Sequence, residues 1–345
     1  ISAADALMQE LGFNTAETSL AYENGSPAAL GNYIASCYID FGFQDGANEA
    51  NDYANISYVP ANSAIEPERA GNPNIVDLDR WQPISLPVFI DQGGNVITDE
   101  PEFLSPEWGR VMPFALSDAD RTTYQRDSFD YEVYFDPGPP PSYAGASADD
   151  YKWGFSLVAI WGSHLDFTDG VMIDISPATV GNNQQLPTRV SDYPQFYDYL
   201  NGGDASQGYV TNPVTGAPYA QQIVPRGDYA RVLAEFWADG PDSETPPGHW
   251  FVILNEVSDH PDIIRQFAGR GDVLGPLEWD VKNYFALGGA MHDSAIAAWG
   301  IKGWYDYLRP VSAIRAMADR GQSSDPTAAS YSIEGIPIVL GHVEL

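Results

Sequence analysis

Basic side chains are scarce in this sequence. Its 345 residues contain 16 Lys and Arg against 48 Asp and Glu, and the formal net charge is −32. Because such a surface repels phosphate, the charge argues against nucleic acid and anionic membranes as partners. It fits a secreted, periplasmic or salt-adapted protein, and we predict a secreted or periplasmic location.

Cysteine and the common catalytic motifs are scarce as well. Cys37 is the only cysteine, so no disulfide can form within the chain. No apolar run approaches the ~18 residues that a membrane span needs. The sequence has no zinc pattern, Gly-x-Ser-x-Gly elbow, Walker loop or dinucleotide fingerprint. Carboxylates are too abundant for any pair to be assigned as a glycosidase dyad.

Apolar periodicity predicts a mainly α protein. Apolar residues recur at helical spacing in four segments, which are residues 27–43, 150–165, 227–239 and 250–256. Between residues 57 and 150 prolines recur, and Asp91–Asn95 has the composition of a hairpin turn between short extended runs. We therefore predict a helical bundle with few short strands. Residues 1–150 would supply N-terminal helices and a long irregular wrap, and residues 151–345 the first part of the core.

The segment 27–43 has one apolar helical face. The pattern i, i+1, i+4, i+5, i+8 predicts that this face is buried, and its members are Tyr33, Ile34, Cys37, Tyr38 and Phe41. We accordingly expect Cys37 to be a small buried hydrophobic residue without a redox role.

Several of the few cations gather near the end of the chain: Lys282, Lys302, Arg309, Arg315 and Arg320. Lys302 and Arg309 are seven residues apart, nearly two helical turns, so we predict that both leave one helix face. Pro310 is expected to end or kink that helix. An ammonium and a guanidinium that converge among aromatic rings would form an oxyanion pocket. We expect the walls of this pocket to be Trp299, Trp304 and Tyr305.

A purely structural role for these two cations is the alternative. Lys302 could pair with Asp306 four residues later, and Arg309 could stabilise a helix C-terminus. Spacing alone favours this alternative, whereas the aromatic surroundings favour the pocket.

The segment Lys302-x6-Arg309-Pro310 resembles the first signature of the vanadium-dependent haloperoxidases and of the related type 2 phosphatidic acid phosphatases. Four stretches resemble the haloperoxidases in the same order, namely residues 236–241, 246–250, 292–299 and 309–315. The resemblance is strongest over residues 150–345. It implies a helical bundle of the haloperoxidase type.

The resemblance also implies a reaction. Vanadate would be bound partly by Lys302 and Arg309, and hydrogen peroxide would oxidise a halide that then modifies a small organic acceptor. His292, His249 and Trp299 are further candidates to line the pocket, although both histidines have a structural role as the alternative. With phosphate in place of vanadate, the same residues would serve an acid-phosphatase-type hydrolase of phosphomonoesters. A non-catalytic secreted protein that keeps the scaffold for assembly is the third alternative.

The second and third signatures of the family, Pro-Ser-Gly-His and Ser-Arg followed by His, are absent after Arg309. We therefore expect the histidine that binds vanadium to lie beyond Leu345, in a longer protein. We expect either a homo-oligomer or association with the missing C-terminal part. Calcium is a further candidate ligand, because the acidic turns 166–169 and 239–244 would suit it, although they would suit solvent equally.

Overall fold

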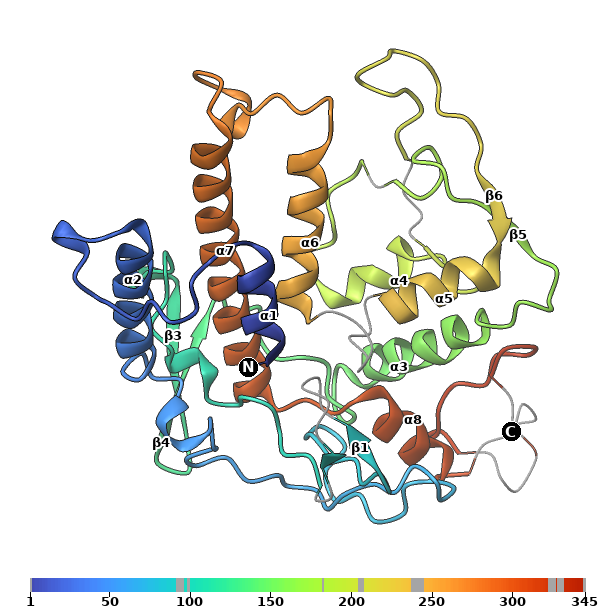
Figure 1. Cartoon of the computed structure of the whole chain (residues 1–345). Coiled ribbons are helices and arrows are strands. Elements are labelled where there is room, and N and C mark those ends of the chain that lie inside the picture. The colour runs from blue at the N-terminus through green and yellow to red at the C-terminus, as the bar shows by residue number, and fades with distance from the viewer. Residues whose placement is uncertain are drawn as a thin grey trace. The chain divides into compact units, whose positions relative to one another are not determined.

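The computed structural model describes all residues except 1, 91–95, 98–99, 182, 204–207, 237–244, 322–326, 328–331 and 344–345. The described chain is mostly helical, with three small antiparallel sheets of two strands each (Figure 1). The prediction of a mainly α protein with few short strands is therefore confirmed. Among the described helices, none has the length and apolar character that crossing a bilayer requires.

The chain forms two compact units, and each combines segments that are distant in sequence. Unit 1 consists of Ile1–Tyr58, Ser105–Asp136 and His292–Trp304. Unit 2 consists of Val59–Leu104, Pro137–Met291 and Tyr305–Leu345. Each unit contains residues from both sides of residue 150. The units therefore do not test the division predicted there, and it stays a prediction.

Unit 1 contains the helices α1 (Ser2–Glu10) and α2 (Pro27–Gly42), the strands β3 (Arg121–Arg126) and β4 (Phe129–Tyr134), and the second half of α7 (Pro276–Tyr305). The β3–β4 hairpin turns at Asp127 and Ser128, whose φ angles of 52° and 68° match the twist of a two-residue hairpin loop. The small hydrophobic core of unit 1 contains Val111, Tyr134 and Ile296.

Two glycines let other backbone segments approach α7 closely in unit 1. A Cβ atom at Gly303 would lie 1.7 Å from the carbonyl oxygen of Pro106, and one at Gly300 would lie 2.7 Å from that of Glu132. The two glycines are three residues apart, so they share one helix face, and that face contacts backbone with no side chain between.

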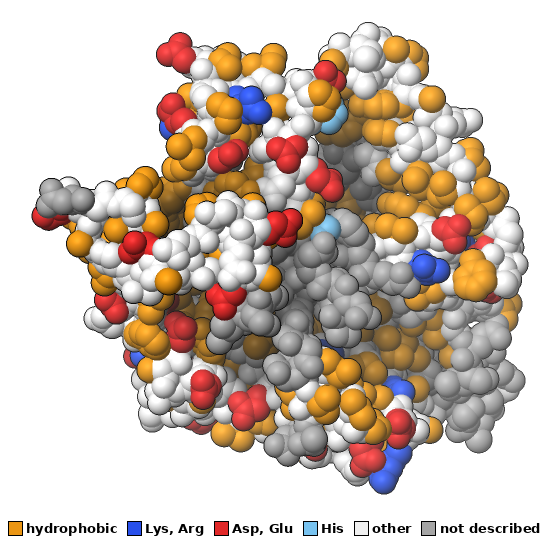
Figure 2. Space-filling model, viewed as in Figure 1, with side chains coloured by type: hydrophobic (Ala, Val, Ile, Leu, Met, Phe, Trp, Pro, Cys, Tyr) orange, Lys and Arg blue, Asp and Glu red, His pale blue; other side chains and the backbone are white. Residues whose placement is uncertain are grey.

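The prediction of a buried face on α2 is wrong. Tyr38 is 65% exposed, Ile34 is 46% exposed, and Cys37 is also exposed. Hydrophobic side chains stand at the surface over α2 in Figure 2. Periodicity identified the helix itself correctly. The helix begins at Pro27, directly after Ser26, whose side chain accepts the N–H of Ala29. It could not show whether a partner for the apolar face exists within the described chain.

Unit 2 contains most of the remaining elements. They are β1 (Phe89–Ile90), β2 (Val96–Ile97), α3 (Ala148–Ser163), β5 (Met172–Asp174), α4 (Tyr193–Phe196), β6 (Ile223–Pro225), α5 (Arg226–Phe236), α6 (Pro246–Asp259), the first half of α7 and α8 (Pro310–Ala318). The predicted helices at 150–165, 227–239 and 250–256 correspond to α3, α5 and α6. The turn predicted at Asp91–Asn95 lies outside the described residues, and the extended runs beside it pair as β1 and β2.

The core of unit 2 forms where α3 meets α8, which lie side by side in Figure 1. Tyr151 and Phe155 of α3 pack against Met317 of α8 and against Leu308 just before it. The first half of α7 packs on α6, where the Phe251 and Tyr284 rings stack 5.4 Å apart. Between residues 57 and 147, the described chain forms strands and single 3-10 turns, as the recurring prolines predicted.

We expect Gly303→Ala to destabilise the protein by about 1–3 kcal/mol or more, because the new methyl group would collide with backbone that cannot move aside. Gly288→Ala on the same helix is the matched control. Its Cβ would meet only a ring atom of Phe251 at 3.9 Å, so the better helix propensity of alanine should stabilise by up to about 1 kcal/mol. Urea unfolding of both variants checks this, and equal stabilities would contradict it.

His164 ends α3 as its C-cap and is only 4% exposed. Burial lowers its pKa from the ordinary 6.5, as does the nearby charge of Arg226, although the bond from Nε2 to the Leu200 carbonyl acts in the opposite direction. With the folded-state pKa below the unfolded one, the unfolded chain takes up the proton first. The stability contributed by neutral His164 is therefore full above pH 6.5 and is lost as pH falls through the folded-state pKa.

His164→Gln should accordingly reduce the loss of unfolding free energy between about pH 7.5 and about pH 5.5. Urea unfolding at both pH values measures this difference. His260→Gln, at a histidine with a side chain 62% exposed, is the control and should leave the loss as in the parent. An unchanged pH dependence in His164→Gln would refute the assignment.

Candidate oxyanion site

The helix predicted to carry both cations stops between them. α7 ends at Tyr305 and α8 begins at Pro310, and Asp306 has a φ of 49°. A residue in this left-handed region cannot continue an α-helix. The prediction that Lys302 and Arg309 leave one face of a continuous helix is therefore wrong. Lys302 belongs to unit 1 and Arg309 to unit 2.

In unit 1, Lys302 lies in the last turn of α7 and is exposed. Its Nζ atom is 4.6 Å from the centre of the Trp299 ring, a cation–π contact that orients the ammonium without neutralising it. The buried glycine face formed by Gly300 and Gly303 adjoins it along the helix. Lys302 is thus an exposed positive charge on a turn that packs tightly through its neighbours.

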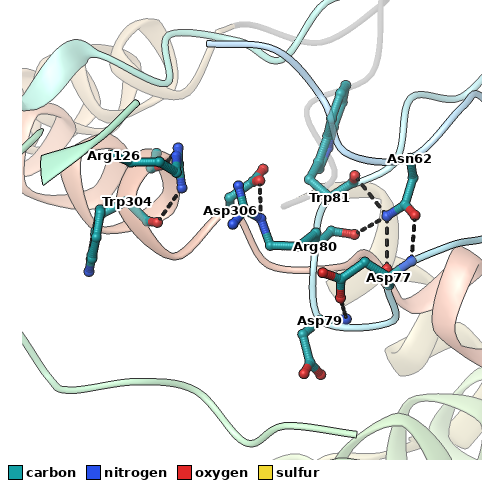
Figure 3. Close-up of polar contacts among 9 residues, drawn as sticks. Asn62, Asp77, Asp79, Arg80, Trp81, Arg126, Trp304 and Asp306 are labelled. Atoms are coloured by element: carbon teal, nitrogen blue, oxygen red, sulfur yellow. Dashed lines mark hydrogen bonds and ion pairs between the residues drawn. The ribbon is translucent and has the colours of Figure 1, made fainter. Parts of the chain in front are cut away.

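Arg126 of β3 binds the same turn. Its Nη1 donates to the carbonyl oxygen of Trp304 at 2.9 Å (Figure 3). Its Nη2 donates to the carbonyl oxygen of Gly303, also at 2.9 Å. The last carbonyl groups of a helix have no partner within it, and a cation is favourable at this end of the helix dipole. The guanidinium also lies 4.4 Å over the Tyr131 ring. Arg126 therefore fixes the turn that carries Lys302.

In unit 2, Arg309 is the N-cap residue of α8, with extended backbone at φ −76° and ψ 151°. Its guanidinium carbon is 5.8 Å from the centre of the Trp81 ring, and the residue is exposed. Partial burial lowers the pKa of Arg309, and the guanidinium stays charged at neutral pH. Pro310 occupies the first helical position, where a missing N–H has no cost.

The partner predicted as an alternative for Lys302 is committed elsewhere. The Asp306 carboxylate is fully buried and pairs with Arg80 Nε at 2.6 Å. A carboxylate buried this deeply is stable only with a close cationic partner, and Arg80 supplies it.

The five clustered cations fall into two groups according to the partners of their side chains. Lys282 pairs with Glu278 and Arg320 with Glu334, and Arg315 donates to the carbonyl oxygens of Arg69 and Pro67. Within the described part of the chain, Lys302 and Arg309 each contact an aromatic ring and have no carboxylate or carbonyl partner. Two exposed cations without counter-ions, in a chain of net charge −32, are chemically suited to an oxyanion ligand.

The other candidate residues have varied surroundings. His292 Nε2 lies 2.8 Å from the carbonyl oxygen of Met112 and donates to it, which favours the structural alternative for this histidine. Its neighbour Asp293 accepts the backbone N–H groups of Phe114 and Ala115 at 2.7 and 2.8 Å. His249 lies half-buried in α6 of unit 2, and a pocket role for it stays a prediction. Of the three candidates His292, His249 and Trp299, only Trp299 contacts Lys302.

The acidic turn 166–169 uses its carboxylates within the protein. Asp169 pairs with Arg226 at 2.7 Å, and Asp166 accepts from Thr168. The turn 239–244 lies outside the described residues. In the part of the chain that the structure describes, no group of three or more His, Cys, Asp or Glu residues could hold a metal ion.

Comparison with protein families identifies one stretch. Residues 282–325 match the model of the VCPO second helical-bundle domain, a domain of vanadium chloroperoxidase. The resemblance to the vanadium-dependent haloperoxidases is confirmed over this stretch. It contains both Lys302 and Arg309 and covers much less than half of the chain. No curated protein and no solved structure matched.

Sequence reasoning missed Arg80, Asp306 as its partner, and Arg126. The pairs Arg80–Asp306 and Arg126–Trp304 are separated by 226 and 178 residues, so no local spacing could indicate them. One weak signal was available. In a chain with so few cations, an isolated arginine outside the cluster is a candidate for a structural link.

We expect Arg126→Leu to destabilise the protein by about 2 kcal/mol, because two charge-assisted hydrogen bonds to the end of α7 are lost. Arg110→Leu is the control, since that guanidinium contacts the Phe129 ring at 4.9 Å and makes no hydrogen bond to the α7 carbonyl groups among the described residues. Guanidinium chloride unfolding measures both. Equal losses of stability would show that the carbonyl contacts of Arg126 have no special weight.

Proposed function

We propose that this protein is a vanadium-dependent haloperoxidase-like enzyme in which Lys302 and Arg309 help to bind vanadate. One observation carries the proposal. The stretch that matches the VCPO domain contains two exposed cations that no carboxylate neutralises among the described residues. In that stretch five Lys and Arg stand against four Asp, whereas acidic residues outnumber basic ones threefold in the whole chain.

The two side chains suit an oxyanion in different ways. The Lys302 ammonium offers three donors on a flexible stem, and the Arg309 guanidinium offers a planar fork that can donate two parallel bonds. Both would donate to vanadate oxygens and reduce its negative charge. We assign both side chains to binding and charge stabilisation and not to acid–base chemistry, because each offers N–H donors to oxyanion oxygens.

Bound vanadate would supply the activation of hydrogen peroxide toward a halide. The net reaction we propose joins a halide, hydrogen peroxide and a proton to give a hypohalous acid and water. The halide loses two electrons to the peroxide. A small organic acceptor would then take up the halogen, and export of the protein to the periplasm or beyond stays part of this proposal.

The phosphomonoester hydrolase is the rival on the same scaffold, since phosphate and vanadate present similar oxygens to Lys302 and Arg309. The description of the matching domain favours the haloperoxidase. Assays of the full-length protein with bromide and peroxide, and separately with a phosphomonoester, distinguish the two. Bromination that requires vanadate supports our proposal, whereas phosphomonoester hydrolysis alone would replace it.

We expect Lys302→Ala and Arg309→Ala each to weaken orthovanadate binding and to lower bromination by about 100-fold, as for the loss of one oxyanion donor. Calorimetric titration and a bromination assay measure the two effects. Lys282→Ala is the matched control, because Lys282 lies on the same helix and pairs with Glu278. If the parent binds neither orthovanadate nor phosphate, the non-catalytic alternative is favoured.

A further inference from the structure

A buried asparagine organises the loop of residues 76–81, which binds Asp306 within unit 2. The Asn62 amide nitrogen lies within hydrogen-bond distance of the carbonyl oxygens of Asp77, Arg80 and Trp81 (Figure 3). Its carbonyl oxygen accepts from the N–H groups of Val76 and Asp77. Asn62 is 2% exposed. One side chain therefore fixes the backbone of residues 76–81 through five contacts.

Two consecutive residues of this loop bind the residue that stops the helix. Arg80 Nε donates to the buried Asp306 carboxylate at 2.6 Å (Figure 3). The N–H of Trp81 donates to the Asp306 carbonyl oxygen, also at 2.6 Å. Side chain and backbone of Asp306 are thus both fixed from one loop. This double attachment stabilises the left-handed conformation of Asp306, which costs free energy for a residue other than glycine.

The residues between Asp306 and Arg309 are also fixed. The Tyr307 hydroxyl donates to the carbonyl oxygen of Pro141 at 2.6 Å, and Leu308 is 3% exposed in the core of unit 2. Arg309 is the first exposed side chain after the break, and its guanidinium lies over the ring of Trp81. The loop that binds Asp306 therefore also supplies the surface on which Arg309 rests.

We propose that Arg80 is a positioning residue for Arg309 and acts through Asp306. This inference rests on the proposed function in one respect, namely that Arg309 binds an oxyanion. A buried ion pair contributes little stability compared with apolar residues of the same size, so its use at this place is explained better by the backbone geometry that it imposes. Removing the pair would let the 306–309 segment move and would displace the guanidinium.

The test removes the pair without leaving a buried charge alone. The double variant Arg80→Met/Asp306→Asn leaves no uncompensated charge, and Arg80→Lys keeps a cation opposite Asp306. We expect the double variant to bind orthovanadate about 10- to 100-fold more weakly, as is usual when a residue supporting a ligand-binding group is lost. Arg80→Lys should recover part of this affinity. Titration of the full-length protein with orthovanadate measures both.

A control separates positioning from general destabilisation. Arg315→Met removes another arginine of unit 2 that links α8 to backbone carbonyls, so it should lower stability and leave orthovanadate affinity unchanged. The decisive comparison repeats Arg80→Met/Asp306→Asn in the Arg309→Ala background. If Arg80 acts through Arg309, affinity should not fall further there. An equal fall in both backgrounds, or no fall in the first, would overturn the proposal.

A second measurement keeps this inference separate from the proposed function. Phenylglyoxal modifies exposed arginines, and mass spectrometry can follow its rate at Arg309 without any anion. The double variant should raise that rate, since Arg309 would leave the Trp81 ring. If the parent binds neither orthovanadate nor phosphate, the proposed function fails. An increased rate would then still support positioning, and an unchanged rate would overturn it.

Discussion

The buried ion pair between Arg80 and Asp306 fixes the residue at which α7 stops. Burying a carboxylate is costly unless a cation compensates it, and Arg80 does so at 2.6 Å. The left-handed backbone of Asp306 then separates α7 from α8, so that Arg309 caps a new helix in place of continuing the old one. The placement of the two cations of the candidate site on different helices follows from this one constraint. Lys302 ends one helix and Arg309 begins the next.

Long-range arginines recur in this protein as links between a side chain and backbone carbonyl groups far away in sequence. Arg126 binds the last carbonyl groups of α7, and Arg315 of α8 binds carbonyl groups near residue 67. A guanidinium can reach several acceptors at once in fixed geometry, which makes it suitable for joining distant backbone segments. In a chain with only 16 basic residues, such structural use makes Lys302 and Arg309 distinctive, since no carboxylate pairs with either of them among the residues that the structure describes.

The glycine face of α7 and Lys302 on its last turn are physically connected within unit 1. Gly300 and Gly303 allow backbone contact that larger residues would prevent, and this contact restricts the turn on which Lys302 lies. A lysine side chain is flexible and loses conformational entropy when it binds a ligand. A rigid turn beneath it limits the further entropy that the backbone would lose. The match to the VCPO domain covers this turn together with α8, which is the part of the chain where fold and proposed chemistry coincide.

The sequence by itself determined most of the helices, the candidate cations and the family resemblance, because apolar periodicity and the Lys302–Arg309–Pro310 spacing are local properties. It could not determine that the helix stops at Tyr305, that Asp306 binds Arg80, or that Cys37 is exposed. Each of these depends on contacts between residues far apart in sequence, or on whether such contacts exist. Only the tertiary structure decided them, since burial and pairing energies arise when distant segments meet.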